Sequence, residues 1–253
     1  MEFLTLTKEN IDSEHICCAI SDKKSVQGYA DKKQWIKQRI DQGYVFLKLP
    51  VRGKVFIEYC PVEVSLLPVE APNFMVINCF WVSGKYKKSG YGQALLQQCI
   101  DDSKLKGRDG LVVLCSDRKR PFLSDKKFFI KQGFTVCDTA DPYFELLTLS
   151  FSKKIKPRFS DSVSRVQKVN SEGFIAFYSK QCVYTNYYTD LQAQIASKYN
   201  LSYQKVLIEN REQALNSPSP FTAYALYFRG KFITHELTAE KKFITIIERL
   251  LQQ

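Results

Sequence analysis

The chain has 253 residues, of which 45% are hydrophobic and 13% aromatic, so it can bury a sizeable core and an intrinsically disordered protein is excluded. This length predicts one large domain or two smaller ones. The net charge of +11 favours an anionic partner such as a nucleic acid, a membrane surface or a polyphosphate cofactor. Charge alone does not separate these partners, and a basic soluble surface explains it equally well.

The first 150 residues predict strands with interleaved helices and no internal repeat, which is the order of an α/β or α+β fold. We expect a helix within 31–43 that closes at Gly43, and a pair of strands within 44–63 that turn at Arg52-Gly53. The stretch 73–83 is typical of a strand buried on both faces. Further elements are expected at 92–106 (helix), 110–116 (strand), 124–134 (short helix) and 144–151 (strand).

Residues 150–167 alternate basic and small polar residues around one proline, which is typical of a linker. We therefore predict a domain over 1–152, a linker over 153–168 and a second domain over 169–253. In the second domain the pattern predicts a strand, a helix over 187–199, a strand, a hairpin turning at Arg229-Gly230 and a final amphipathic helix. About ninety residues are enough for a small independent domain.

The eight cysteines and two histidines lack the spacing of a disulfide framework or a metal site, so no metal is expected. Cys17 and Cys18 are expected to pack in a helix. Four others lie in apolar stretches, where cysteine packs as a small hydrophobe: Cys60, Cys79, Cys99 and Cys115. The N-terminal stretch is too polar for a signal peptide, and no apolar run is long enough to span a membrane. A cytoplasmic location follows.

The stretch "KYKKSGYGQALL", residues 85–96, places a basic turn and two glycines between a buried strand and a helix. The start of a helix presents unpaired backbone N–H groups and a partial positive charge, so a pyrophosphate can bind there. Glycine allows the backbone to approach the phosphates closely. The spacing fits neither a Walker A loop nor the G-x-G-x-x-G of a Rossmann domain.

"KKSGYG", residues 87–92, resembles the signature of the GNAT superfamily of acyl-CoA-dependent N-acyltransferases, which is Arg or Gln, two residues, Gly, one residue, then Gly or Ala. Lysine takes the first place here. "FFIKQGF", residues 128–134, is similar to a second motif of that family, a short helix closing in Gly-Phe. The resemblance covers residues 1–150 and implies binding of acetyl-CoA. The cofactor-binding residues that it implies are Phe80, Trp81, Val82, Lys87, Lys88, Ser89, Gly90, Tyr91, Gly92 and Gln93.

Within this resemblance, the strand end at 80–82 is expected to pair with the pantetheine arm, and the backbone amides of 88–93 to hold the pyrophosphate. The basic run 118–120 is either a site for the adenosine 3′-phosphate or a solvated loop. Two departures leave the chemistry open. Phe129 stands where many members have a tyrosine that protonates the leaving thiolate, and an asparagine often found after the strand at 111–115 is missing.

Acyl transfer to an amine needs a base, and Glu58 is an acid within an apolar strand, where burial can raise its pKa. A strand-edge or acceptor-binding charge is the alternative. Asn78 is a candidate for orienting water or substrate, or else a bonded core amide. Ser116 and Asp117 end a buried strand and are candidates for the acceptor side only.

The second domain resembles the thioredoxin fold, in which a strand leads to an active-site cysteine at a helix N-terminus. Cys182 takes that place, where a helix dipole lowers a thiol pKa, but Thr185 replaces the second cysteine. Pro218 and Pro220 lie slightly upstream of the position of that fold's cis-proline. The pairing of both domains is similar to bacterial acetyltransferases with a YoaP-like C-terminal module. Cys182 is either structural or a reactive thiol.

The sequence thus predicts a bacterial N-acetyltransferase that acts on an amine of a small molecule or peptide. Two alternatives stay open: a monothiol thioredoxin-like protein with a CoA-binding domain, and an acyl-CoA-binding regulator without turnover. Neither a nucleic acid nor a membrane is an expected partner, because the basic residues are dispersed and no nucleic-acid-binding motif is present. The acceptor amine and the number of subunits, with a dimer as one option, stay open.

Overall fold

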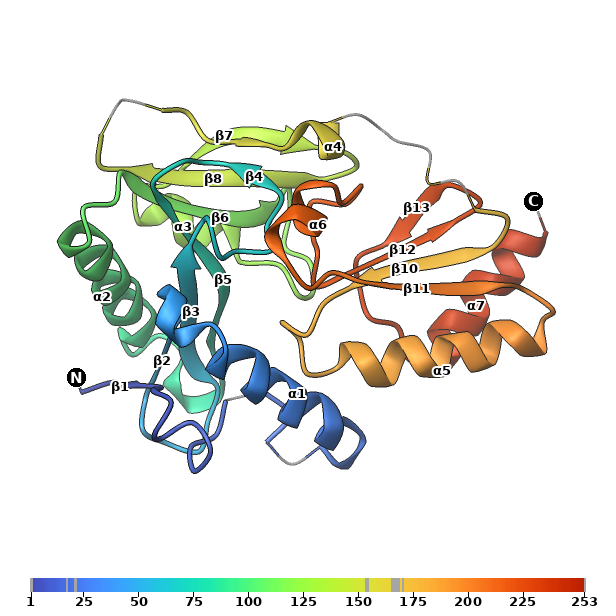
Figure 1. Cartoon of the computed structure of the whole chain (residues 1–253), viewed down its shortest axis with the longest axis horizontal. Helices are drawn as coiled ribbons and strands as arrows, with labels where there is room; N and C mark the ends of the chain where they lie inside the picture. Colours follow the sequence, from blue (N-terminus) through green and yellow to red (C-terminus); the bar gives the residue numbers. More distant parts are fainter. Residues whose placement is uncertain are drawn as a thin grey trace.

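The computed structural model describes residues 2–16, 18–20, 22–152, 155–164, 169 and 171–252. It contains a seven-stranded sheet built by the N-terminal part of the chain and a four-stranded sheet built by the C-terminal part, lying side by side (Figure 1). In the described part of the chain, no helix has both the length and the apolar composition that crossing a membrane requires.

The seven-stranded sheet has the order β1-β2-β3-β5-β6-β8-β7, and every neighbouring pair is antiparallel except β5 and β6. Its strands are β1 (Leu4–Thr5), β2 (Val45–Lys48), β3 (Val55–Pro61), β5 (Phe74–Val82), β6 (Gly110–Ser116), β7 (Thr135–Ala140) and β8 (Phe144–Ser150). The helices of this part are η1 (Lys23–Ser25), α1 (Val26–Lys37), η2 (Ile40–Gln42), η3 (Gly84–Tyr86), α2 (Tyr91–Leu105) and α3 (Lys126–Lys131).

The expected strand pair, the helix after the glycine turn and the short helix are confirmed. Three other features differ from the expectation. The first helix begins at Val26 and ends at Lys37, and Gly43 closes only the following 3-10 turn, with φ of 92°. Strand β7 was not expected because half of its side chains are exposed and one is buried, which masks the apolar periodicity of a strand. Residues 73–83 are not buried on both faces, because β5 is only partly buried from Asn78 onward.

The parallel strands β5 and β6 pair over only part of their length. The register runs from Phe74 opposite Gly110 to Ile77 opposite Val113, and β6 then continues in pairing with β8 alone. A bulge at this point sets Glu58 of β3 opposite Cys79 and Tyr59 opposite Ile77, so that Asn78 is the extra residue. The two strands therefore separate beyond Ile77, which leaves one edge of residues 78–82 unpaired.

The four-stranded sheet has the order β11-β10-β12-β13, with β10 and β11 parallel and the other pairs antiparallel. Its elements are β10 (Phe174–Tyr178), α5 (Thr185–Lys198), β11 (Tyr203–Leu207), α6 (Arg211–Leu215), β12 (Tyr224–Phe228), β13 (Lys231–Thr234) and α7 (Glu240–Leu251). The predicted hairpin turn is confirmed, since Arg229 and Gly230 have φ of 47° and 79°. The peptide bonds before Pro218 and Pro220 are trans; the cis bond among the described residues is Asp141–Pro142.

The segment predicted as a linker carries regular structure where it is described. Strand β9 (Arg158–Phe159) pairs with β4 (Val69–Glu70), and α4 (Asp161–Ser164) follows. Phe159 is buried against the seven-stranded sheet. The described part of 153–168 is therefore bound along the N-terminal domain, while residues 153, 154 and 165–168 lie outside the described residues.

The two domains share buried contacts. Trp35 and Ile36 of α1 belong to one apolar cluster with Val183 and Ile208 of the C-terminal part. A Cβ atom at Gly28 of α1 would lie 2.0 Å from the carbonyl oxygen of Val183, so only glycine permits this approach. Two domains that share buried side chains in this way hold the space between them in a fixed shape.

Candidate active site

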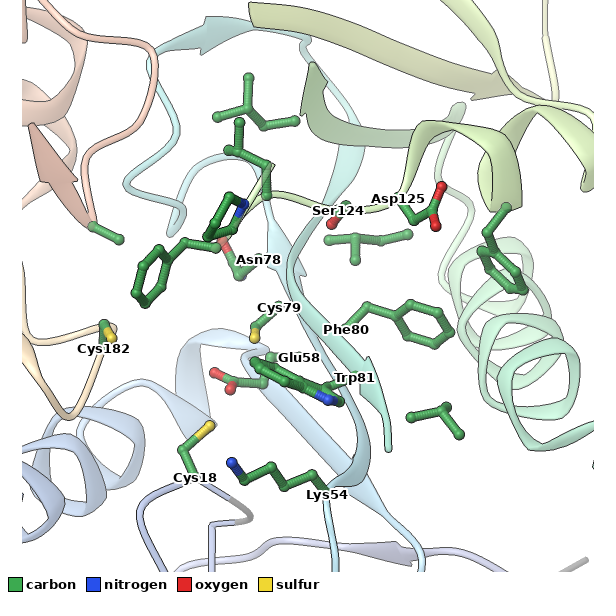
Figure 2. Close-up of a pocket in the computed structure, with 18 of the residues that line it drawn as sticks. Cys18, Lys54, Glu58, Asn78, Cys79, Phe80, Trp81, Ser124, Asp125 and Cys182 are labelled. Carbon is green, nitrogen blue, oxygen red and sulfur yellow. The ribbon is translucent and has the colours of Figure 1, made fainter. Parts of the chain in front are cut away.

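A cavity of about 880 Å³ lies where β5 and β6 separate, and residues of both domains line it (Figure 2). Its lining includes β5 from Val76 to Val82, the glycine turn, and the loop before α3. The C-terminal domain contributes residues 181–184 and 221–224 together with His235 and Leu237. The cavity is thus open to the unpaired edge of β5 on one side and closed by the second domain on the other.

The glycine turn lies at the cavity. Gly90 has φ of 78° and precedes the first residue of α2, which has no side-chain cap. A helix start of this kind leaves backbone N–H groups free for an anion. The predicted residues that line the cavity here are Lys87, Lys88, Gly90, Gly92 and Gln93. Ser89 and Tyr91 do not, since the Ser89 hydroxyl faces the Lys87 carbonyl and Tyr91 packs edge-on against Tyr86.

Successive side chains of β5 point to opposite sides of the strand. Phe80 packs against Phe128 and Phe129, and its ring lies 3.4 Å from where a Cβ of Gly92 would be. Cys79 and Trp81 point away from Phe80, toward Glu58 and Lys54 (Figure 2). We call the side of Phe80 and Gly92 the cofactor face, and the opposite side the acceptor face. Val82 also lines the cavity.

Phe129, at the position where a proton donor would be expected, is fully buried in an aromatic cluster with Phe80, Phe128 and Phe134. Its ring has no group that donates a proton. The chemistry therefore depends on other residues for the leaving thiolate.

Glu58 is 1% exposed and is held by two partners. One carboxylate oxygen lies 2.5 Å from the Lys32 ammonium, and the other accepts a hydrogen bond of 2.6 Å from the Tyr44 hydroxyl. Burial lowers the pKa of Lys32, but the Glu58 carboxylate outweighs it and the pKa is raised, so Lys32 is charged. Burial, followed by the charge of Glu58, raises the pKa of Tyr44. Glu58 thus sits in a buried, hydrogen-bonded ion pair at the cavity wall.

Asn78 lines the cavity as the bulge residue of β5, and its amide is bonded on both sides. Its oxygen accepts from the Ser65 hydroxyl at 3.3 Å, and its nitrogen donates to the Cys60 sulfur at 3.2 Å. These contacts fit the alternative interpretation of Asn78, a core amide held by hydrogen bonds. They fix the bulge that separates β5 from β6.

Three cysteines from distant parts of the chain line the acceptor face: Cys18, Cys79 and Cys182. Burial raises the pKa of each thiol, that of Cys182 to about 11. The shift at Cys182 is opposite to the one expected, because α5 begins only at Thr185 and its dipole does not outweigh desolvation. Cys18 lies in a loop before η1 rather than in a helix, and Cys17 lies outside the described residues.

Only part of the basic run 118–120 lies at the cavity. Lys119 and Arg120 line the cavity, and the Arg120 guanidinium lies over the ring of Tyr143 at 3.7 Å and beside Asp117 at 3.2 Å. Ser116 is buried, its hydroxyl donating to the carbonyl of Arg118. Ser116 and Asp117 are not among the residues that line the cavity.

Three parts of the cavity wall were not expected from the sequence: Lys54, Cys18 and the residues of the second domain. Lys54 lies in the hairpin turn between β2 and β3, where a lysine carries no signal of function. Within the described residues, no group of three or more His, Cys, Asp or Glu is placed to hold a metal ion.

The uncharacterised N-acetyltransferase YoaP of Bacillus subtilis (strain 168) is 39% identical to this chain over 251 residues, which is 99% of this chain and 100% of that protein. The chain belongs to the YoaP family of GNAT N-acetyltransferases. A YoaP-like family model also matches residues 204–244, which run from β11 into α7.

Two N-acetyltransferases are among the solved structures that are similar to this chain. The PaiA N-acetyltransferase of Thermoplasma acidophilum, in complex with coenzyme A, covers 60% of this chain and 100% of its own at 14% identity and a TM-score of 0.41. The ribosomal-protein-alanine N-acetyltransferase of Brucella melitensis covers 59% of this chain and 99% of its own at 14% identity and a TM-score of 0.42.

Proposed function

We propose that this N-acetyltransferase transfers the acetyl group of acetyl-CoA to an amine of a small molecule or peptide. The observation that carries the proposal is the place of the glycine turn. Gly90 and the uncapped start of α2 lie at the same cavity as the unpaired edge of β5. The extended pantetheine arm adds to that edge as a further strand, and the pyrophosphate binds the N–H groups of the helix start beside Lys87 and Lys88.

In the reaction, the amine nitrogen attacks the thioester carbonyl, a C–N bond forms, and the C–S bond breaks to release CoA. Backbone N–H groups of the unpaired edge of residues 78–82 are placed to polarise the carbonyl oxygen. Glu58 on the acceptor face accepts the proton that the amine loses. Its bonds to Lys32 and Tyr44 fix its position and leave lone pairs for the amine or a bridging water.

We assign the four-stranded domain the thioredoxin-like fold on the basis of its element order and its strand order, with one parallel and two antiparallel pairs. Its edge with Cys182 and residues 221–223 faces the cavity. The raised thiol pKa makes Cys182 a poor nucleophile at neutral pH. We therefore assign this domain the role of a wall of the acceptor site rather than of a redox centre.

The test is acetyl-CoA binding by isothermal titration calorimetry. Lys88→Glu places a negative charge beside the pyrophosphate and is expected to weaken binding at least about tenfold, since a charge-assisted contact contributes about 1.5–3 kcal/mol. Lys85→Glu is the matched control, because Lys85 lies in the same basic turn but does not line the cavity. It is expected to leave the Kd within about threefold.

Two results would count against the proposal. No binding of acetyl-CoA by the wild-type protein at millimolar ligand would refute it. Tight binding without CoA release, measured by chromatography against a broad amine panel, would favour the regulator without turnover.

A further inference from the structure

The acceptor face has an unusual balance of charge. Two carboxylates line the cavity among the described residues, Glu58 and Asp125. The charge of Glu58 is compensated by Lys32. Asp125 lies on the other side of β5, where it caps α3 by accepting from the backbone N–H of Lys127 (Figure 2). The acceptor face therefore offers no uncompensated negative charge to an incoming ammonium group.

The cavity lining also holds the cations Lys32, Lys119 and Arg120, of which Lys32 pairs with Glu58 and Arg120 with Asp117. The groups that reach the acceptor face from the loop at Cys18, from Cys79 and from the loop at Cys182 are uncharged. The thiols of Cys18, Cys79 and Cys182 are protonated at neutral pH because burial raises the pKa of each. The second domain adds Gln181 and Thr222, which are polar but neutral.

Lys54 adds a positive charge to this face. Its ammonium lies 5.1 Å from the centre of the Trp81 ring and points into the cavity between Trp81 and Cys18 (Figure 2). Within the described part of the chain it forms no ion pair. Its backbone is fixed at the start of the β3–β5 pairing, where its carbonyl accepts from the N–H of Ser83. The lysine thus presents a free positive charge from a fixed backbone position. Its ammonium lies over the Trp81 side chain, which is 44% exposed.

We infer that the acceptor is an amine that also bears a carboxylate, that Lys54 binds this carboxylate, and that Trp81 packs against the body of the molecule. The inference rests on the proposed function. An ammonium in a partly desolvated cavity binds an anion through a charge-assisted hydrogen bond. One ammonium balances the single charge of a carboxylate, whereas a phosphate monoester carries a charge of about −1.5 to −2 at pH 7. The same positive field disfavours polycationic amines.

The experiment compares L-amino acids with their carboxamides as acceptors, with spermidine and O-phosphoethanolamine as the polycationic and phosphate arms. CoA release is measured by chromatography at saturating acetyl-CoA. The wild-type protein is expected to prefer the carboxylate members in kcat/KM, and Lys54→Met to lower that preference at least about tenfold through KM. Lys54→Arg is expected to restore part of the preference, and Lys85→Met, which leaves the cavity unaltered, to preserve it.

Comparing the carboxylate-to-amide ratio between variants cancels the different basicity of the two amines. An unchanged ratio in Lys54→Met would overturn the inference. A higher Kd for acetyl-CoA in that variant would also overturn it, because it would place Lys54 at the cofactor. Preference of the wild-type protein for amides, spermidine or O-phosphoethanolamine would also refute it. If acetyl-CoA binds and no carboxylate-bearing amine releases CoA, the inference fails while the cofactor site stands. If acetyl-CoA does not bind, the proposed function itself fails.

Discussion

The two sides of β5 are built in different ways. The cofactor face comes from one nearly continuous stretch, since Phe80, the glycine turn and the start of α2 follow each other within residues 80–93. The acceptor face is assembled from the loop at Cys18, the strands β3 and β5, and the loop at Cys182 in the second domain. One side depends mainly on backbone groups, and the other on side chains that only the tertiary structure brings together.

This difference fits the two tasks. A pyrophosphate can be bound by backbone N–H groups at a helix start, so short local spacing is enough to define the site. An acceptor has to be distinguished from other amines, and that selection depends on which side chains meet in the cavity. Changes on the acceptor face are therefore expected to alter the choice of substrate and the chemistry, and to leave acetyl-CoA binding intact.

The largest effect is expected for Glu58→Gln. Loss of the base should lower kcat about 100-fold or more, with an unchanged Kd for acetyl-CoA. The variant also leaves the Lys32 ammonium buried without its partner, which should lower the free energy of unfolding by about 3–5 kcal/mol. Steady-state kinetics below the unfolding transition and urea denaturation measure the two effects separately.

The double variant Lys32→Met, Glu58→Gln is the matched control. It removes both charges of the pair, so stability should largely recover while kcat stays low. If kcat in the single and double variants stays within about threefold of wild type, Glu58 is not the base. The acceptor face would then not supply the group that accepts the proton.

A smaller effect is expected where the two domains meet at His235. Its ring accepts from the Tyr143 hydroxyl at 2.6 Å and donates to the Pro121 carbonyl at 2.9 Å, and burial lowers its pKa below 6.5. Because the pKa is lower in the folded protein, the unfolded chain binds a proton on this histidine at a pH where the folded protein does not. The stability contributed by neutral His235 is thus present above pH 6.5 and is lost as the pH falls toward the folded pKa.

Thermal unfolding between pH 8 and pH 5 tests this sign. The midpoint of the wild-type protein should fall by a few degrees more than that of His235→Gln, which keeps a polar side chain but does not titrate. Parallel curves for the two proteins would show that His235 is not responsible for the pH dependence.

The smallest effect is expected at Cys182. With a pKa of about 11, roughly one thiol in a thousand is ionised at pH 8, so alkylation by iodoacetamide should be slow at neutral pH and accelerate up to pH 11. Cys182→Ser should keep kcat/KM within about threefold. Mass spectrometry of alkylated protein over this pH range, with free cysteine as reference, measures the rate. Rapid labelling at pH 7.5 would favour the alternative in which Cys182 is a reactive thiol.

The parts of the protein that could be predicted are those with local signals. The glycine turn, the strand before it and the hairpin at Arg229-Gly230 were all visible, because positive φ, apolar runs and helix starts select residue types at fixed spacing. The element order of the second domain was also visible, apart from the short helix α6.

The acceptor face could not be predicted in the same way. Cys79 was expected to be a small core residue, and it lines the cavity because the bulge at Asn78 turns the end of β5 away from β6. The partners of Glu58 lie in α1 and at the start of β2, and nothing in the spacing of Lys32 or Tyr44 indicates the pairing. Such contacts depend on the packing of elements that are distant in the sequence.

The close contact between Gly28 and Val183 has a consequence for the newly made chain. Domains fold largely in the order in which they leave the ribosome. The seven-stranded sheet that carries the cofactor face ends at Ser150 of β8, whereas one side of α1 is covered only when residue 183 is present. We therefore expect a stage of synthesis in which the sheet that carries the cofactor face has formed while the acceptor face is still open, and translation of the C-terminal domain ends that stage.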